Sequence, residues 1–470
     1  MAAWWLDDAN ATFDARERAY RLYRERGNPR DAARMATWLA WDYIAFRGER
    51  AVANGWLQRA RRLLGDVERC PEHAWLALRE ASWALGEDAE KTRRLSVEAR
   101  ELAESVGDLD LEMTARALEG LALVGLGSVE EGMRLLDEAS AAAVGGEMSD
   151  RTQIGFACCY LIFACERVRD YDRAAQWCER LSEYCDRTGL RPLFSLCRAH
   201  YGGVLTWRGT WAEAEEELLR ATADLQARRP AQWGDGLVRL AELRRQQGRL
   251  EQARELLGRA EPHPFVPLGR ALLHLDRGEP EPALDQVEHF LRALGGERRI
   301  ERAPGLEVKG RALVGLGRAD EAEETLGELR ELAAVAGTEP LRAGERMTSG
   351  LVARAAGKPE EARACFEDAV ELSCEAGQPS RPLARGSSSR ACSRRSVAVR
   401  PRARRAGLPE RPCTSSAPRT RPRGPRPSST RSSLPPGSHR GAAMAVSAPA
   451  SSRSSASSPR ASATGRSQNG

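Results

Sequence analysis

Cysteine is the residue type whose clustering in this sequence comes nearest to a chemical pattern. Cys158 with Cys165, and Cys178 with Cys185, are pairs seven residues apart that fall on one face of a helix. Exposed thiols can act as redox sensors, but buried ones serve as small apolar contacts between helices, and we favour this second role over sensing or zinc binding. Because the eleven cysteines are irregularly spaced and contain no CxxC pair, we expect reduced thiols and no disulfide. The clustered cysteines are Cys158, Cys159, Cys165, Cys178, Cys185 and Cys197.

No other motif with catalytic or metal-binding spacing occurs. The six histidines never form HxxxH or HExxH, so no helix face presents a metal pair. Gly357-Lys358 is followed by Pro359 and lacks the GxxxxGK[ST] pattern that cradles a nucleotide phosphate. The acidic residues Glu215 and Glu217 are expected on an exposed face, outside any catalytic group. The sequence therefore predicts no catalytic, cofactor-binding or metal-binding residue, no cofactor and no enzyme activity.

Aromatic and basic side chains offer binding chemistry instead. All eleven tryptophans lie between residues 4 and 233, and Trp207 and Trp211, one turn apart, are candidates for a ligand groove. Packing between helices explains such tryptophans more simply, and we favour it. The arginines Arg239, Arg244 and Arg245 are suited either to clamping a peptide carboxylate or to an ordinary solvated helix face.

Charge and hydropathy restrict where the protein acts. The sequence has no apolar run long enough to span a membrane, and its first eight residues lack the zones of a signal peptide, so we expect a cytoplasmic protein without a membrane partner. Residues 379–470 hold 19 arginines and one glutamate, a charge of +18, which leaves −13 of the overall +5 to residues 1–378. The net charge therefore describes neither part and is no evidence for nucleic-acid binding.

A repeated turn pattern predicts that pairs of helices position these residues. A glycine followed five residues later by alanine recurs, mostly in steps of 39 to 43 residues. Such a glycine can end one helix in the left-handed conformation, and the flanking stretches have the apolar spacing of helices. A small residue seven before the glycine should let two antiparallel helices approach closely, and a large apolar residue nine after it should fill the groove of the next pair. The clearest turns are Gly48/Ala53, Gly209/Ala214, Gly248/Ala253, Gly278/Ala283, Gly317/Ala322 and Gly357/Ala362.

One such pair cannot bury its own apolar face, so the pairs must stack. We therefore predict an all-α, tetratricopeptide-like α-solenoid over residues 1–378, because the order of small residue, glycine, alanine and large apolar residue is similar to the tetratricopeptide repeat, with a longer period. Three segments further resemble the repeat arm of LuxR-type transcriptional regulators. They are ARERAYRLYRERG at residues 15–27, WLAWDYIAFRGERAVANGWLQRARRLL at 38–64 and GFACCYLIFACERVRDYDRAAQWCERL at 155–181.

The LuxR resemblance implies a sensory or partner-binding arm that would reach DNA only through a carboxy-terminal helix-turn-helix, which this sequence lacks. The alternative is a free-standing scaffold that binds a protein, a peptide or a small-molecule effector in its concave groove. Residues 379–470 are mostly arginine, serine, proline and alanine, and we expect them to be disordered. An arginine-rich nucleic-acid arm and a plain linker are possible explanations of this tail, but we favour a shift of reading frame near codon 378. We also expect the amino terminus to begin partway through a helix.

Overall fold

A computed structural model describes residues 2–5, 8–85, 87–188, 191–294 and 299–376 of the chain. Every regular element in these ranges is helical, so the predicted all-α class is confirmed. The predicted disorder and origin of residues 379–470 lie outside the described residues and stay predictions, as does the boundary at residue 378.

The helices follow one another with short connections. The first half holds α1 (Ala2–Trp5), α2 (Ala9–Glu25), α3 (Pro29–Asp42), the π-helical turn η1 (Tyr43–Arg47), α4 (Arg50–Leu64), α5 (Pro71–Ala84), α6 (Ala89–Val106), α7 (Leu109–Leu126), α8 (Val129–Gly145), α9 (Arg151–Val168) and α10 (Tyr171–Thr188). The second half holds α11 (Arg191–Arg208), α12 (Trp211–Arg228), the 3₁₀ turn η2 (Pro230–Gln232), α13 (Trp233–Gln246), α14 (Leu250–Arg259), α15 (Val266–Asp276), α16 (Pro280–Leu294), α17 (Arg299–Gly315), α18 (Ala319–Ala336), α19 (Glu339–Ala355) and α20 (Pro359–Glu375).

The turn inside seven of the helix pairs has the predicted form. In these pairs a glycine ends the first helix with a φ between 68° and 97°, the left-handed conformation that a side chain disfavours. The alanine five residues after the glycine is at most 3% exposed in each of the six turns with that pattern. The predicted repeat frame is therefore confirmed. The turn glycines are Gly48, Gly127, Gly209, Gly248, Gly278, Gly317 and Gly357.

The small and large residues around the turn pack differently from the prediction. A Cβ atom added to Gly202 would lie 2.6 Å from the Leu218 side chain, and one added to Gly350 would lie 2.5 Å from Phe366. The small residue thus permits close approach, as predicted. However, the large residue covers the glycine of its own pair, whereas we expected it in the groove of the next pair. The reason is that positions seven before and nine after the turn lie opposite each other in an antiparallel pair.

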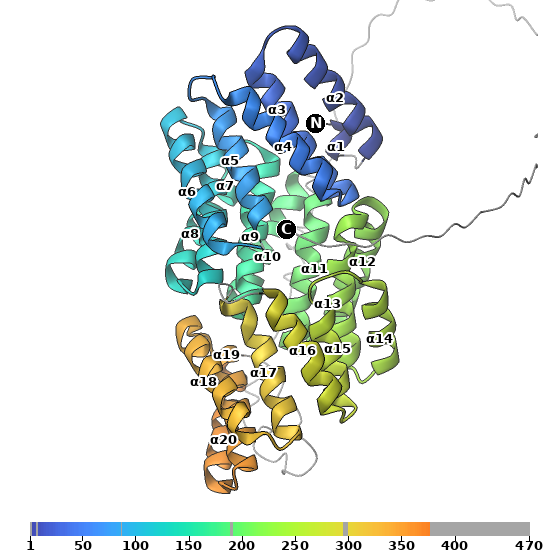
Figure 1. Ribbon diagram of the computed structural model, residues 1–470, viewed down its shortest axis with the longest axis vertical. Helices are drawn as coiled ribbons and strands as arrows, with labels where there is room; N and C mark the ends of the chain where they lie inside the picture. Colours follow the sequence, from blue (N-terminus) through green and yellow to red (C-terminus); the bar gives the residue numbers. More distant parts are fainter. Residues whose placement is uncertain (1, 6–7, 86, 189–190, 295–298, 377–470) are drawn as a thin grey trace, which may run out of the picture. The chain divides into compact units, whose positions relative to one another are not determined.

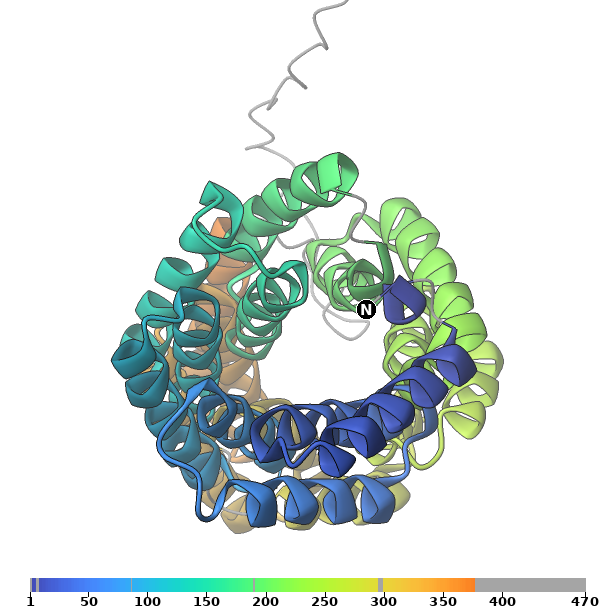
Figure 2. The same ribbon diagram turned by 90° about the horizontal axis from the view of Figure 1, so that it is seen from above.

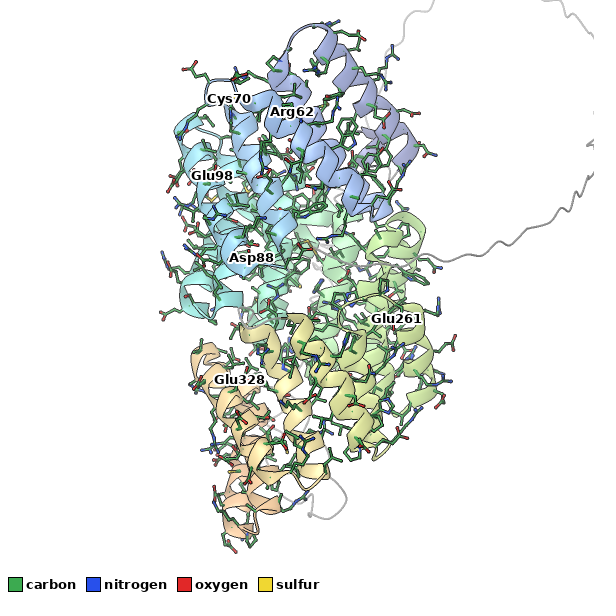
Figure 3. All side chains as sticks on the ribbon, in the orientation of Figure 1. Arg62, Cys70, Asp88, Glu98, Glu261 and Glu328 are labelled. Carbon is green, nitrogen blue, oxygen red and sulfur yellow. A yellow bond between two sulfur atoms is a disulfide. The ribbon has the colours of Figure 1, made fainter. Side chains whose placement is uncertain are left out.

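The pairs stack into two layers. Each odd-numbered helix from α3 to α17 packs against the next odd-numbered helix, which forms a continuous inner layer, and the even-numbered helices pack outside it. Viewed from above, the helix pairs are arranged around a common axis (Figure 2). Charged side chains such as Arg62 on α4 and Glu98 on α6 are exposed on the outer layer (Figure 3). Asp88, also labelled there, caps α6 by accepting a hydrogen bond of 2.7 Å from the Lys91 backbone N–H.

The stacked helix pairs wind around the common axis, and successive turns of this winding contact each other. The pair α17–α18 lies against α7, α8 and α9, which Figure 1 shows as yellow and orange helices next to the teal ones. At the other end, η1 packs against η2, and the Arg229 guanidinium lies 4.5 Å from the ring centre of Trp4 in α1. The inner layer is therefore enclosed by contacts between turns as well as within them. None of the helices in the described ranges is long and apolar enough to cross a membrane.

Candidate functional site

Three inner-layer helices bring aromatic and charged side chains together near the amino terminus. Helix α3 is capped by Asn28, whose side-chain oxygen accepts a hydrogen bond from the Asp31 N–H, and α9 is capped by Asp150 in the same manner. Helix α5 begins at a proline, which suits the first turn of a helix. On α3, Trp41 and Asp42 follow Trp38 by three and four positions, and on α5 Arg79 follows Trp75 by four, so the residues of each helix share one face. We call this group the Arg79 cluster; it consists of Trp38, Trp41 and Asp42 on α3, Trp75 and Arg79 on α5, and Phe156 on α9.

The guanidinium group of Arg79 is surrounded by aromatic rings. Its central carbon lies 4.8 Å from the ring centre of Trp41, 5.0 Å from Phe156, 5.1 Å from Trp38 and 5.7 Å from Trp75. Cations over aromatic faces at such distances gain electrostatic attraction to the rings. The residue is only 4% exposed, and burial lowers the pKa of Arg79 to about 10. This guanidinium therefore carries its charge in poorly hydrated surroundings.

The polar atoms of the cluster are incompletely paired within the described part of the chain. Neither Nε nor Nη2 of Arg79 has a hydrogen-bond partner there, and the same holds for Nε1 of Trp41, Nε1 of Trp75 and Oδ1 of Asp42. Most buried polar groups in folded proteins are hydrogen-bonded, so such a concentration is unusual. Gln153, one turn before Phe156 on α9, is fully buried with an amide that also finds no partner among these residues.

Several buried arginines act on one carboxylate in this cluster. The carboxylate of Asp42 lies 2.5 Å from Nη1 of Arg16, and the charges of Arg229 and Arg79 also act on it. Burial nevertheless dominates and raises the pKa of Asp42 to about 6. Three buried guanidinium groups thus surround one buried carboxylate. Asp150, at the start of α9, adds a second negative charge that acts on Arg79.

A second polar group lies further along the inner layer. Glu166 on α9 accepts hydrogen bonds from Nε (2.9 Å) and Nη2 (2.7 Å) of Arg239 on α13, and His200 Nδ1 on α11 lies 2.5 Å from Glu166 Oε2. Burial and the Arg239 charge lower the pKa of His200, whose Nδ1 also lies 2.6 Å from Nη2 of Arg239. We call these residues, with Asp235 and His263, the Glu166 cluster.

The Glu166 cluster is built for internal pairing. Although burial raises it, the charges of Arg239 and His200 hold the pKa of Glu166 far below its ordinary value. Arg239 Nη2 also lies 3.4 Å from His200 Nε2, so both imidazole nitrogens face charged groups of the cluster rather than a nucleophile. Among the residues that the structure places, no group of three or more histidine, cysteine or acidic side chains is arranged to hold a metal ion.

A cleft of about 730 Å³ lies where two turns of the winding meet. It is bounded by the start of α8, the connection between α9 and α10, and the connection between α18 and α19. Its floor includes Arg169, whose Nη1 lies 2.7 Å from Glu307 Oε1 and whose backbone φ is 59°. The Thr338 hydroxyl donates to the Val168 carbonyl across the same boundary, at 2.6 Å. The cleft therefore belongs to the contact between turns.

The predicted binding arginines are mostly engaged inside the chain. Arg244 pairs with Glu215 at 2.8 Å, and Arg245 pairs with Glu242 at 2.7 Å and with Asp276. Together with Arg239, they act as internal ion-pair partners, not as a free clamp. Glu215 and Glu217 are correspondingly half-buried and bound by arginines, whereas we expected an exposed face.

Trp207 and Trp211 do not line a common groove, which was the less favoured of the two roles considered for them. Trp207 lies under the Arg169 guanidinium, 5.5 Å from its central carbon, whereas Trp211 is 36% exposed and donates to the Thr206 carbonyl. The tryptophans that do gather at a polar site are those of the Arg79 cluster. A signal for them exists in the sequence, because WLAWD at 38–42 and WLALR at 75–79 place a charge four residues after a tryptophan in consecutive units.

The cysteine prediction needs one correction. Cys159 and Cys197 form a disulfide between α9 and α11, with Cα atoms 5.7 Å apart, whereas we expected none. Their separation of 38 residues is close to one repeat, so the two residues occupy similar places on neighbouring inner helices. Cys158, Cys165 and Cys178 are buried outside this disulfide, and burial raises the pKa of Cys165 and Cys178. The side chain of Cys185 lies outside the described residues.

Comparison with solved structures identifies the fold. The crystal structure of a Rap protein complexed with competence and sporulation factor aligns with 73% of this chain and 98% of its own, with a TM-score of 0.53 and 11% sequence identity. The fold is tetratricopeptide-like. At this identity, the likeness extends to the fold alone.

Weaker likenesses involve two further helical-repeat proteins. The apo form of the quorum sensor NprR from B. thuringiensis is 11% identical, with coverage of 72% of this chain and 97% of its own and a TM-score of 0.42. A signal transduction ATPase with a tetratricopeptide repeat sensor from Pyrococcus horikoshii is 13% identical, with coverage of 68% and 53% and a TM-score of 0.38. No protein-family model and no curated protein matches the sequence. The LuxR resemblance gains no support from these comparisons.

Proposed function

We propose that this chain is a non-catalytic scaffold that binds a protein or peptide partner along the inner layer of its helices. The observation that supports this most is the composition of that layer: it carries two separate groups of buried aromatic and charged side chains where an ordinary solenoid core would be apolar. Helical-repeat arrays bind extended partners on their concave side, with successive helices contacting successive residues. The helices α3, α5, α9, α11 and α13 supply these groups in order along the winding.

A selection experiment tests the proposal. The full chain is immobilised and challenged with random heptapeptides displayed with free carboxyl termini, at about 0.5 M salt to suppress general attraction to arginine. We expect enriched peptides whose binding slows hydrogen exchange in the odd-numbered inner helices. A library without enriched members, or protection confined to the even-numbered outer helices, would contradict the proposal.

The LuxR-type regulator is the second candidate, and its support is the resemblance of three sequence segments. Under that assignment the helices would still bind an effector or partner, and DNA contact would require a helix-turn-helix module, whose motif we do not recognise in the sequence. The peptide experiment does not separate the two candidates, because both place the ligand on the helical array. The scaffold is the better supported function, since it needs only the helical array, whose fold is shared with the Rap protein structure.

A further inference from the structure

We infer that the Arg79 cluster is a carboxylate-binding site, in which the edge of the Arg79 guanidinium formed by Nε and Nη2 binds one carboxylate of a peptide ligand. This inference rests on the proposed peptide-binding function. It names the chemical group that the inner layer recognises near the amino terminus of the array. The carboxylate belongs either to the carboxyl terminus of the peptide or to an acidic side chain.

The two unpaired atoms of Arg79 have the right arrangement for this ligand. Nε–H and the outer N–H of Nη2 are parallel donors on one edge of the planar guanidinium group. A carboxylate accepts two parallel hydrogen bonds from such an edge, which makes this pairing both strong and selective for planar anions. Both atoms are buried without a hydrogen-bond partner among the described residues, and the whole residue is only 4% exposed.

The charge around Arg79 favours an anion. Arg16, Arg79 and Arg229 all act on the single buried carboxylate of Asp42, one oxygen of which is already held by Arg16. The buried guanidinium of Arg79 itself has no hydrogen-bond partner at Nε or Nη2 among the described residues, and a buried charge without a partner is costly. A ligand carboxylate would supply that partner. A cationic ligand would be repelled by the guanidinium, which is why we assign an anion and not an amine.

The aromatic rings give the site a second preference. Trp38, Trp41, Trp75 and Phe156 lie around the guanidinium group and provide no hydrogen bond to its Nε or Nη2. Two of these rings, Trp41 and Trp75, also have indole N–H groups without a partner in the described residues. A carboxylate attached to an apolar side chain fits these surroundings better than a small inorganic anion. We therefore expect a carboxylate next to an apolar residue.

Three small probes test the assignment on the full chain. They are N-acetyl-leucine, N-acetyl-leucinamide and N-acetylglutamic acid α-amide, observed by saturation-transfer NMR and by the fluorescence of the surrounding tryptophans. We expect binding of N-acetyl-leucine and none of the leucinamide. The third probe tells the sources apart: binding as tight as that of N-acetyl-leucine indicates recognition of acidic side chains, and weaker binding indicates recognition of the carboxyl terminus.

Variants of Arg79 provide the second arm. Arg79→Lys keeps the charge but loses the two-pronged edge, and should weaken N-acetyl-leucine binding at least about tenfold; Arg79→Met should abolish it. The matched control is Arg34→Met, because the Arg34 guanidinium also lies over Trp75, at 4.4 Å, but is paired with Glu72. Arg34→Met should change the affinity for N-acetyl-leucine by no more than about twofold, which is less than the change expected when one hydrogen bond is lost.

Several outcomes would overturn the assignment. Equal binding of the acid and the amide by the unmodified protein would do so, and so would unchanged affinity in Arg79→Lys. If Arg79→Met fails to fold, the acid and amide comparison and the lysine variant still decide. Peptides from the library that bind Arg79→Lys as they bind the parent would refute this site but leave the proposed scaffold function intact, whereas an empty selection would refute that function itself.

Discussion

The two buried charged groups of the inner layer differ in how their arginines are paired. Arg239 donates two hydrogen bonds to Glu166 and lies within 3.5 Å of Asp235, so its charge is balanced inside the protein. Arg79 is surrounded by aromatic rings, but its Nε and Nη2 have no hydrogen-bond partner within the described residues. Breaking a balanced buried pair is costly, so the Glu166 cluster should contribute to stability, whereas the Arg79 cluster has the character of a binding site.

Asp235 offers a test of that distinction through pH. Burial raises its pKa, but the hydrogen bond from His263 and the charge of Arg239 outweigh this and lower the pKa of Asp235 to about 2. The unfolded value is about 4, so the native state holds this proton less tightly. Its contribution to stability is therefore present above about pH 4 and is lost as the pH falls towards 2.

Asp235→Asn should reduce the free energy of unfolding by about 1–2 kcal/mol at pH 7 and by much less near pH 2. Urea unfolding followed by circular dichroism at pH 7, 4 and 2 measures this. Asp14→Asn, at an exposed position of α2, is the control and should change little at any pH. A deficit that is the same at all three pH values would show that the variant acts through packing and not through the charge of Asp235.

At the scale of helices, packing depends on size at a few positions of each pair. Ala214 is fully buried in the first turn of α12, and Leu218, one turn later, covers Gly202 of α11. The helices are too close there for a longer side chain. The same relation recurs at Ala253 in α14, which is also fully buried.

Ala214→Leu and Ala253→Leu should each lower the free energy of unfolding by about 1–3 kcal/mol, because the added atoms push the paired helices apart. Ala212→Leu is the matched control, since Ala212 lies on the exposed face of α12. Thermal melts of the four proteins provide the measurement. Melting temperatures for the Ala214 and Ala253 variants equal to that of Ala212→Leu would show that the assigned register is wrong.

The helical pairs could be predicted from the sequence because their signals are local. Gly209 and Ala214 lie within one turn and its flanks, where backbone conformation and residue size act directly. The Arg79 cluster depends on Phe156 in α9 meeting Trp41 in α3, across more than a hundred residues, and no local pattern reports that contact. The Cys159–Cys197 disulfide is not predicted by spacing within a helix for a related reason, because it joins similar positions of consecutive repeats.

At the scale of the whole array, contacts between turns hold the winding closed. Arg167 on α9 lies 3.2 Å from Glu301 on α17, and Arg169 lies 2.7 Å from Glu307 on the same helix. These contacts join segments well over a hundred residues apart, so they constrain the array in a way that neighbouring pairs cannot. A ligand that enters the inner layer must pass between turns held in this manner or enter along the axis.

Substitution of Arg169 tests whether the contacts between turns stabilise the protein by more than the unfavourable backbone conformation of this residue destabilises it. Its φ of 59° is unfavourable for any residue but glycine, by roughly 1–2 kcal/mol, so Arg169→Gly would stabilise an isolated turn. The same change removes the ion pair with Glu307 and the hydrogen bond to the Pro340 carbonyl, and the loss of a buried pair costs about 3–5 kcal/mol. If the contact between turns stabilises the protein, the lost contacts should outweigh the relieved backbone strain. Arg169→Gly should then lower the free energy of unfolding and speed hydrogen exchange in α17 and α19 more than in α12.

Glu307→Gln weakens the same ion pair but leaves the backbone strain of Arg169 in place. It should therefore also lower the free energy of unfolding, and no relief of strain offsets its effect. A more stable Arg169→Gly protein with unchanged exchange in α17 would mean that the turns merely touch, and that the stacking of neighbouring pairs alone maintains the winding.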